Sequence, residues 1–299
     1  MKSFVSPNES EVDVTTIKGF TIDIVNRINR ADILGMGAQL AYYFLLSIFP
    51  LLIFIVTLLP YLKLQHHQVF AFLGDIMPAE VYMLTEDIIV DALTNQNSGL
   101  LSLGFIGTMW SASRGVNALI KGLNRAYDVE GKSGFINRFW SIIFTVSLVV
   151  LIFIALIFPV FGQQLGNLLF SYMGIESSFE SVWTFIRWIT PVALIITVVS
   201  VMYWIVPNTD PRLTFSSIIP GTVFATLGWV ILTYGFSFYV NNFANYSATY
   251  GSIAGVIVLM LWLYFTGIIL ISGGLLNAAL QNRQIVKMDK QKGNLNIEG

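Results

Sequence analysis

Long apolar stretches separated by short polar connections make up most of this sequence. Six stretches reach the roughly 20 residues with which an α-helix crosses about 30 Å of hydrocarbon, because each helical residue rises about 1.5 Å. They are residues 38–61, 100–120, 139–161, 182–206, 215–239 and 252–276. The pattern predicts an all-α, polytopic membrane protein with six transmembrane helices.

Lysine and arginine are distributed unevenly among the connections between these stretches. Those on the same side as the termini are Lys2, Lys18, Arg27, Arg30, Lys121, Arg125, Lys132, Arg138, Arg212, Arg283, Lys287, Lys290 and Lys292. The connections on the other side contain only Lys63. Because lysine and arginine accumulate in cytoplasmic loops, both termini are predicted to be cytoplasmic. Omitting the second stretch would move the last four cations to the wrong side, so the same rule supports counting it.

Segments outside the predicted spans complete this organisation. Residues 15–30 place charged residues among apolar ones at helical spacing, which predicts an amphipathic helix in the cytoplasmic interface or under the bundle. The apolar residues are Ile17, Phe20, Ile24 and Ile28. The loop 62–99 is mainly acidic and predicts a small helical extracytoplasmic cap, and residues 282–299 predict a polar cytoplasmic tail. Residues 1–281 are therefore predicted to form a single membrane domain.

Composition distinguishes this chain from soluble proteins and from several classes of enzyme. Its residues are 55% hydrophobic and 11% charged, with a mean hydropathy of +0.72, whereas soluble domains carry about 25% charged residues. The chain has no cysteine, which excludes disulfides and thiolate sites. Its two histidines, His66 and His67, are adjacent and have no cluster of further ligands around them. We therefore expect no metal, no cofactor, no nucleic-acid partner and no enzymatic activity.

The second apolar stretch contains a charged residue, Arg114, whose insertion into a bilayer costs roughly 2.5–3.5 kcal/mol. Arg114 belongs to a polar stripe, because residues three and four positions apart share one helical face. The stripe consists of Trp110, Arg114, Asn117, Lys121, Asn124 and Asp128. One interpretation is a polar cavity or pathway in which Arg114 contacts an anionic group such as phosphate. The other is structural, with the side chain reaching water or capping carbonyl groups of a neighbouring helix.

Arg187 is a second charge within a predicted span, near its outer end. Helical rise separates its depth from that of Arg114 by roughly 14 Å. One small anion therefore cannot contact both arginines, whereas a long amphiphile, or a ligand bound in two steps, can. The alternative for Arg187 is anchoring at the interface beside Trp183 and Trp188. The candidate ligand-binding residues are Trp110, Arg114, Asn117, Asn124 and Arg187.

Seven short motifs follow one another along most of the chain. They are Ala41-Tyr-Tyr-Phe-Leu-Leu-Ser47-Ile-Phe-Pro50, Trp110-Ser-Ala-Ser-Arg114-Gly, Leu123-Asn124-Arg-Ala-Tyr127, Val206-Pro207-Asn208, Pro220-Gly221, Tyr250-Gly251-Ser252 and Leu261-Trp262-Leu-Tyr264. In this order they resemble the YihY/virulence factor BrkB family of bacterial inner-membrane proteins. The resemblance implies a multi-pass protein of the bacterial cytoplasmic membrane, with roles in envelope integrity and lipid movement.

Two features of the resemblance bear on chemistry. Members of the family were once labelled ribonuclease BN, but this sequence offers no residues for that reaction. The family commonly has Gly-Ala-Glu-Leu near the end of the last span, where this chain has Gly273-Gly274-Leu275-Leu276. The carboxylate of the family is thus replaced by Leu275, which argues against a mechanism that relies on it.

These observations lead to two functional hypotheses. The first is a transporter or flippase-like protein for an anionic amphiphile or lipid, in which Arg114 holds the head group. The second is a non-transporting scaffold for envelope integrity, whose function resides in the outer loop or the tails. Both place the protein in the lipid bilayer, and neither specifies an oligomeric state.

Overall fold

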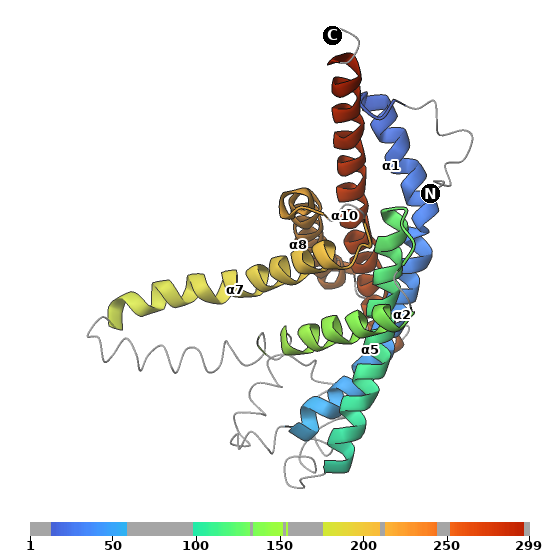
Figure 1. Cartoon of the computed structure of the whole chain (residues 1–299). Helices are drawn as coiled ribbons and strands as arrows, with labels where there is room; N and C mark the ends of the chain where they lie inside the picture. The colour runs from blue at the N-terminus through green and yellow to red at the C-terminus, as the bar shows by residue number, and fades with distance from the viewer. Residues whose placement is uncertain are drawn as a thin grey trace. The chain divides into compact units, whose positions relative to one another are not determined.

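The computed structural model describes residues 13–58, 98–131, 134–151, 154, 176–209, 213–243 and 252–295. Every regular element in these ranges is a helix, so the predicted all-α class is confirmed for the described part of the chain. The helices are α1 (Ile17–Ala31), α2 (Ile33–Leu58), α5 (Ser98–Ala126), α7 (Glu176–Ile205), α8 (Phe215–Phe243) and α10 (Ser252–Leu295), shown in Figure 1. A further helix covers Gly134–Leu151.

Within the described ranges, four helical segments are long and apolar enough to cross a membrane. They are Ile33–Ile55, Gly134–Leu151, Phe215–Tyr239 and Gly255–Gln291, and Val192–Ile205 is a shorter apolar helix. α5 is not among the four, because Arg114 and several serines lower its hydropathy. The predicted cap falls almost entirely on residues outside the described ranges, as does the end of the predicted span 139–161.

The chain divides into two compact units, which are described separately. The larger unit comprises Met1–Ala41 and Val116–Gly299, and the smaller unit comprises Tyr42–Gly115. The boundaries fall inside α2 and α5, so each of these helices contributes residues to both units.

Close contact between α8 and α10 organises the larger unit. A Cβ atom on Gly221 would collide with the carbonyl oxygen of Gly273 and with the side chain of Asn277. Asn277 is 1% exposed; its Oδ1 accepts a hydrogen bond from the Gly221 N–H at 2.6 Å, and its Nδ2 donates to the Ile218 carbonyl at 3.0 Å. A buried amide with both ends paired thus fixes the point at which the two backbones approach.

α1 packs against the polar end of α10, as Figure 1 shows. Arg283 on α10 donates from Nη2 to the Thr15 carbonyl at 3.0 Å and lies 5.0 Å from the centre of the Phe20 ring. Lys290 forms an ion pair with Asp13 at 2.7 Å. The side chain of Thr16 caps the start of α1 by accepting a hydrogen bond from the Gly19 N–H at 3.1 Å.

The structure confirms a helix where the amphipathic helix was predicted, and its four apolar residues differ in burial, with Phe20 and Ile24 half-buried. Its buried residues are Gly19, Arg27 and Ala31, whereas Ile17 is 81% exposed and Ile28 is also exposed. Contacts with α10 and with the end of α5 bury the face of α1 that contains Arg27 and Ala31. Ile17 and Ile28 therefore remain on the outside of the unit.

The smaller unit is built on glycine contacts between α2 and α5. A Cβ atom on Gly104 would lie 2.8 Å from the backbone nitrogen of Phe54, and one on Gly107 would lie 3.0 Å from Cβ of Pro50. The rings of Phe54 and Phe105 pack with their centres 5.4 Å apart. Small residues therefore bring these two backbones close together, as they do in helix pairs within membranes.

Replacing Gly221 by alanine tests the α8–α10 contact. The added methyl group meets a backbone carbonyl that cannot rotate away, so we expect Gly221→Ala to lower the free energy of unfolding by about 1–3 kcal/mol. Gly235→Ala on the same helix is the control, because a Cβ atom there meets nothing within 4 Å. Thermal unfolding of the two purified variants compares them, and equal unfolding temperatures would contradict the contact.

The ion pair between α1 and α10 predicts a pH dependence. The Lys290 ammonium and then the Thr15 hydroxyl and N–H hold the pKa of Asp13 at about 2, below its ordinary value of 3.8. Because this pKa is lowered in the folded protein, the ion pair stabilises the docking of α1 at pH values above the ordinary pKa of 3.8. This stabilisation is lost as the pH falls towards 2. Carboxyl NMR should show the pKa of Asp13 rising in Lys290→Gln and unchanged in Lys287→Gln. No rise in Lys290→Gln would exclude the contact.

Candidate functional site

Arg114 and Trp110 form a paired cation and aromatic ring on α5, within the smaller unit. The guanidinium carbon of Arg114 lies 5.6 Å from the centre of the Trp110 ring. Arg114 is exposed and Trp110 is 52% exposed. The separation is within the range of a cation–π interaction, which holds the guanidinium over the ring and leaves its N–H donors to other groups.

An exposed apolar ridge continues from this pair along the same side of α5. Leu103 and Ile106 are 67% and 61% exposed. Residues 103, 106, 110 and 114 are spaced by three, four and four positions, so their side chains follow one face of the helix. The face therefore changes from aliphatic to aromatic to cationic along its length, which matches an amphiphile with an apolar tail and an anionic head.

The three buried hydroxyl groups of α5 in this unit are satisfied within the helix itself. Thr108 donates to the Gly104 carbonyl at 2.7 Å, Ser111 to the Gly107 carbonyl at 2.7 Å, and Ser113 to the Trp110 carbonyl at 3.0 Å. All three residues are buried. These serine and threonine residues contribute to helix packing, and Arg114 is the charged group that this part of α5 presents outward.

The two asparagines of the predicted site lie in the larger unit. Asn117 is half-buried. Asn124 is buried, and its Oδ1 accepts a hydrogen bond from the backbone N–H of Asn208 at 3.2 Å. Asn208 in turn donates from Nδ2 to the Glu130 carbonyl at 3.2 Å. Asn124 therefore holds the segment between α7 and α8 against the end of α5.

The remaining polar residues of the stripe and Arg187 occupy different settings. Lys121 and Asp128 are exposed, and Asp128 Oδ2 lies 3.5 Å from Arg30 Nη1. Arg187 lies within α7, and its side chain is outside the described residues. Of the five residues predicted to bind a ligand, the structure brings Trp110 and Arg114 together and places Asn117 and Asn124 in the other unit.

The structure also reveals a buried arginine that the sequence pattern grouped with the solvent-facing cations. Arg27 is 9% exposed; its Nε donates to both carboxylate oxygens of Asp23 at 3.0–3.1 Å, and its Nη1 donates to the Ala126 carbonyl at 3.1 Å. The spacing of four between Asp23 and Arg27 is the one sequence signal for this pair. The bond to the end of α5 comes from residues 99 positions apart and depends on the tertiary fold.

Comparison with known proteins identifies the family. The family model described as virulence factor BrkB matches residues 24–297. The chain belongs to the virulence factor BrkB family. The resemblance predicted from the seven motifs is thus confirmed.

Relatives of this BrkB family member include proteins named for their membrane location. The "Putative ribonuclease-like protein YfkH" of Bacillus subtilis (strain 168) is 47% identical over 89% of this chain and 96% of its own length. A UPF0761 membrane protein of Psychrobacter sp. (strain PRwf-1) is 25% identical over 79% of this chain, which spans 44% of that relative's length. A UPF0761 membrane protein of Alteromonas mediterranea is 26% identical over 83% of each chain. No solved structure matches this chain.

The hydrogen bond of Asn124 predicts that the two asparagines contribute differently to stability. Asn124→Ala leaves the Asn208 N–H without its partner, so we expect a loss of about 1–3 kcal/mol in the free energy of unfolding. Asn117→Ala on the same helix should change it by less than about 0.5 kcal/mol. Chemical or thermal unfolding of both variants measures the difference. Equal losses would show that Asn124 does not fix the segment before α8.

Proposed function

We propose that this BrkB family protein is a transporter or flippase-like protein for an anionic amphiphile, most simply a phospholipid. The single observation that carries the proposal is the outer face of α5 in the smaller unit. There an exposed guanidinium rests on a tryptophan ring at one end of an exposed aliphatic ridge. Such a face supplies donors for a phosphate group and apolar surface for an acyl chain.

The chemistry of arginine favours this ligand over a neutral one. A guanidinium presents five N–H donors in a planar fork that matches phosphate oxygens, and it carries its charge at all physiological pH values. Aliphatic surface at Leu103 and Ile106 would be exposed to lipid in a membrane. An amphiphile satisfies both parts of the face at once, whereas a small inorganic anion satisfies only the charge.

The proposal includes the topology predicted from the sequence. Six crossings with both termini in the cytoplasm place the Trp110–Arg114 pair nearer the cytoplasmic side, and the distribution of lysine and arginine supports this orientation. Arg187 then belongs to the outer part of the pathway. The ribonuclease-like name of the Bacillus subtilis relative is not extended to this chain, because its sequence offers no catalytic set for that reaction.

A non-transporting scaffold for envelope integrity is the second candidate. The packing between α8 and α10 favours it, because the Gly221–Gly273 contact and the paired amide of Asn277 leave no room between the backbones at that point. A scaffold requires a rigid bundle but no lipid movement. It predicts that purified wild-type protein does not transport lipid at all.

Substitution of Arg114 tests the leading proposal. Hydrogen bonds to a charged group contribute about 1.5–3 kcal/mol, so Arg114→Gln should weaken binding of phosphatidylglycerol roughly tenfold or more. Because Arg114 is exposed, the variant should unfold at the wild-type temperature. Liposomes containing fluorescent phosphatidylglycerol or phosphatidylcholine measure transport of each lipid, and binding is measured in detergent.

Arg125→Gln provides the matched control, since it removes the same charge from an exposed position of the same helix. It should retain the wild-type preference for phosphatidylglycerol. Full binding and transport by folded Arg114→Gln would overturn the role of Arg114. Absence of lipid transport by the wild-type protein would favour the scaffold.

A further inference from the structure

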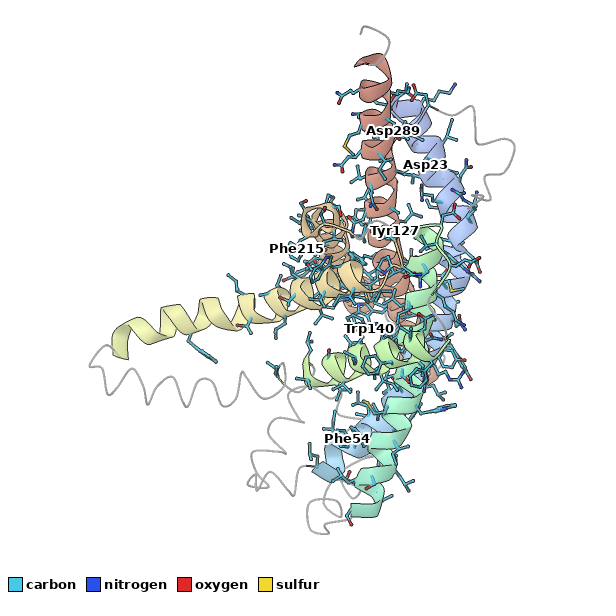
Figure 2. The ribbon with its side chains drawn as sticks, viewed as in Figure 1. Asp23, Phe54, Tyr127, Trp140, Phe215 and Asp289 are labelled. Carbon is cyan, nitrogen blue, oxygen red and sulfur yellow. The ribbon has the colours of Figure 1, made fainter. Side chains whose placement is uncertain are left out.

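A small cavity with polar and apolar lining residues lies in the larger unit, where α1, the end of α5, the segment after α7 and α10 meet. Its volume is about 180 Å³, and its polar lining comes from Arg27, Tyr127, Thr209, Gln281 and Asn282. Figure 2 labels Asp23 on α1 and Tyr127 at the end of α5. All described lining residues belong to this unit, whereas Trp110 and Arg114 belong to the smaller unit.

Two hydroxyl groups at this cavity are buried without a partner among the described residues. They are Tyr127 Oη and Thr209 Oγ1. Tyr127 is 8% exposed, and the nearby side chain of Asn277 does not meet it in hydrogen-bond geometry. A buried hydroxyl without a hydrogen bond costs roughly 1–3 kcal/mol. Two such groups beside one cavity therefore indicate that something inside it accepts their hydrogen bonds.

Burial raises the pKa of the Tyr127 hydroxyl above its usual range, and the nearby charge of Arg27 offsets only part of this rise. Tyr127 consequently stays protonated and acts as a donor at physiological pH. The Arg27 guanidinium is also a donor only, and the side-chain amides of Gln281 and Asn282 offer further N–H groups.

Hydrogen bonds to Asp23 and to the Ala126 carbonyl hold the guanidinium of Arg27 in place. Asp23 binds its Nε, and the Ala126 carbonyl binds its Nη1. These contacts use two of the five N–H donors of a guanidinium, so donors remain for a ligand. Among the described residues, no aspartate or glutamate lines the cavity. The described lining thus offers N–H and O–H donors but no carboxylate, around a space well below the about 300–1,000 Å³ of pockets for drug-sized ligands.

We propose that this cavity binds a phosphate-type oxyanion, through Arg27, Tyr127 and Thr209. An oxyanion accepts hydrogen bonds from all three side chains and is small enough for the space. Two sources present this chemistry, namely free phosphate and the head group of a phospholipid. The site is distinct from the proposed function at Arg114 and does not depend on it.

Two substitutions test the site without disturbing Arg27, which also holds α1 to α5. Tyr127→Phe and Thr209→Val each remove one hydroxyl and keep the shape of the side chain. Calorimetric titration of inorganic phosphate into the full-length protein, in detergent free of other oxyanions, measures binding. Wild-type protein should show saturable binding, and each variant should bind roughly tenfold more weakly. Without phosphate, both variants should unfold at the wild-type temperature or above it, because a buried unpaired hydroxyl has been removed.

Matched controls are Tyr234→Phe and Thr197→Val, which change the same residue types at exposed positions. Both should keep wild-type affinity for phosphate, and so should Arg125→Gln, whose exposed side chain is not part of the cavity lining. In nanodiscs, phosphatidylglycerol that competes with phosphate identifies a head group as the ligand. Lack of competition identifies free phosphate.

Three results would overturn the proposal. The first is the absence of saturable binding of inorganic phosphate to the wild-type protein. The second is wild-type affinity in both hydroxyl variants. The third is a lower unfolding temperature of Tyr127→Phe without phosphate, combined with unchanged binding, which would assign the hydroxyl a purely structural role.

Discussion

The close approach of α8 and α10 at Gly221 and Gly273 is the constraint on which the larger unit depends. Two backbones can approach this closely only where neither residue carries a Cβ atom. The approach brings the amide of Asn277 within reach of the α8 backbone. It also accompanies a hydrogen bond from the Tyr203 hydroxyl on α7 to the Leu270 carbonyl on α10, at 2.5 Å. The two glycines, the Asn277 amide and the Tyr203 phenol together connect α7, α8 and α10.

Polar groups in the described helices serve two different purposes. Most of the buried serine and threonine hydroxyls bond to carbonyls of their own helix, and Asn124 and Asn277 join segments far apart in the sequence. Arg114 differs, because it is exposed and rests on Trp110. Tyr127 and Thr209 form a third group, because their hydroxyls are buried but have no hydrogen-bond partner in the described part of the chain. Groups whose bonding capacity the fold leaves unused are where ligands are expected.

Spacing along the chain predicted the local features of the candidate site. Positions 110 and 114 share a helical face at any tertiary arrangement, so the pairing of the tryptophan with the arginine follows from the helix alone. The role of Asn124 did not follow, because its partner Asn208 is 84 positions away. Alternation of apolar and charged residues located the α1 helix but left its burial open, and Ile17 and Ile28 are exposed in the folded unit.

The sequence by itself determined the helical class, the membrane character and the family, because long apolar runs and ordered motifs are local properties. Tertiary structure decided which polar side chains form hydrogen bonds within the protein and which remain available to bind a ligand. Arg27 resembles the other cytoplasmic cations in the sequence, and only the meeting of α1 with the end of α5 buries it. The cavity beside it forms for the same reason: its lining comes from segments that are far apart in the sequence and that only the folded chain brings together.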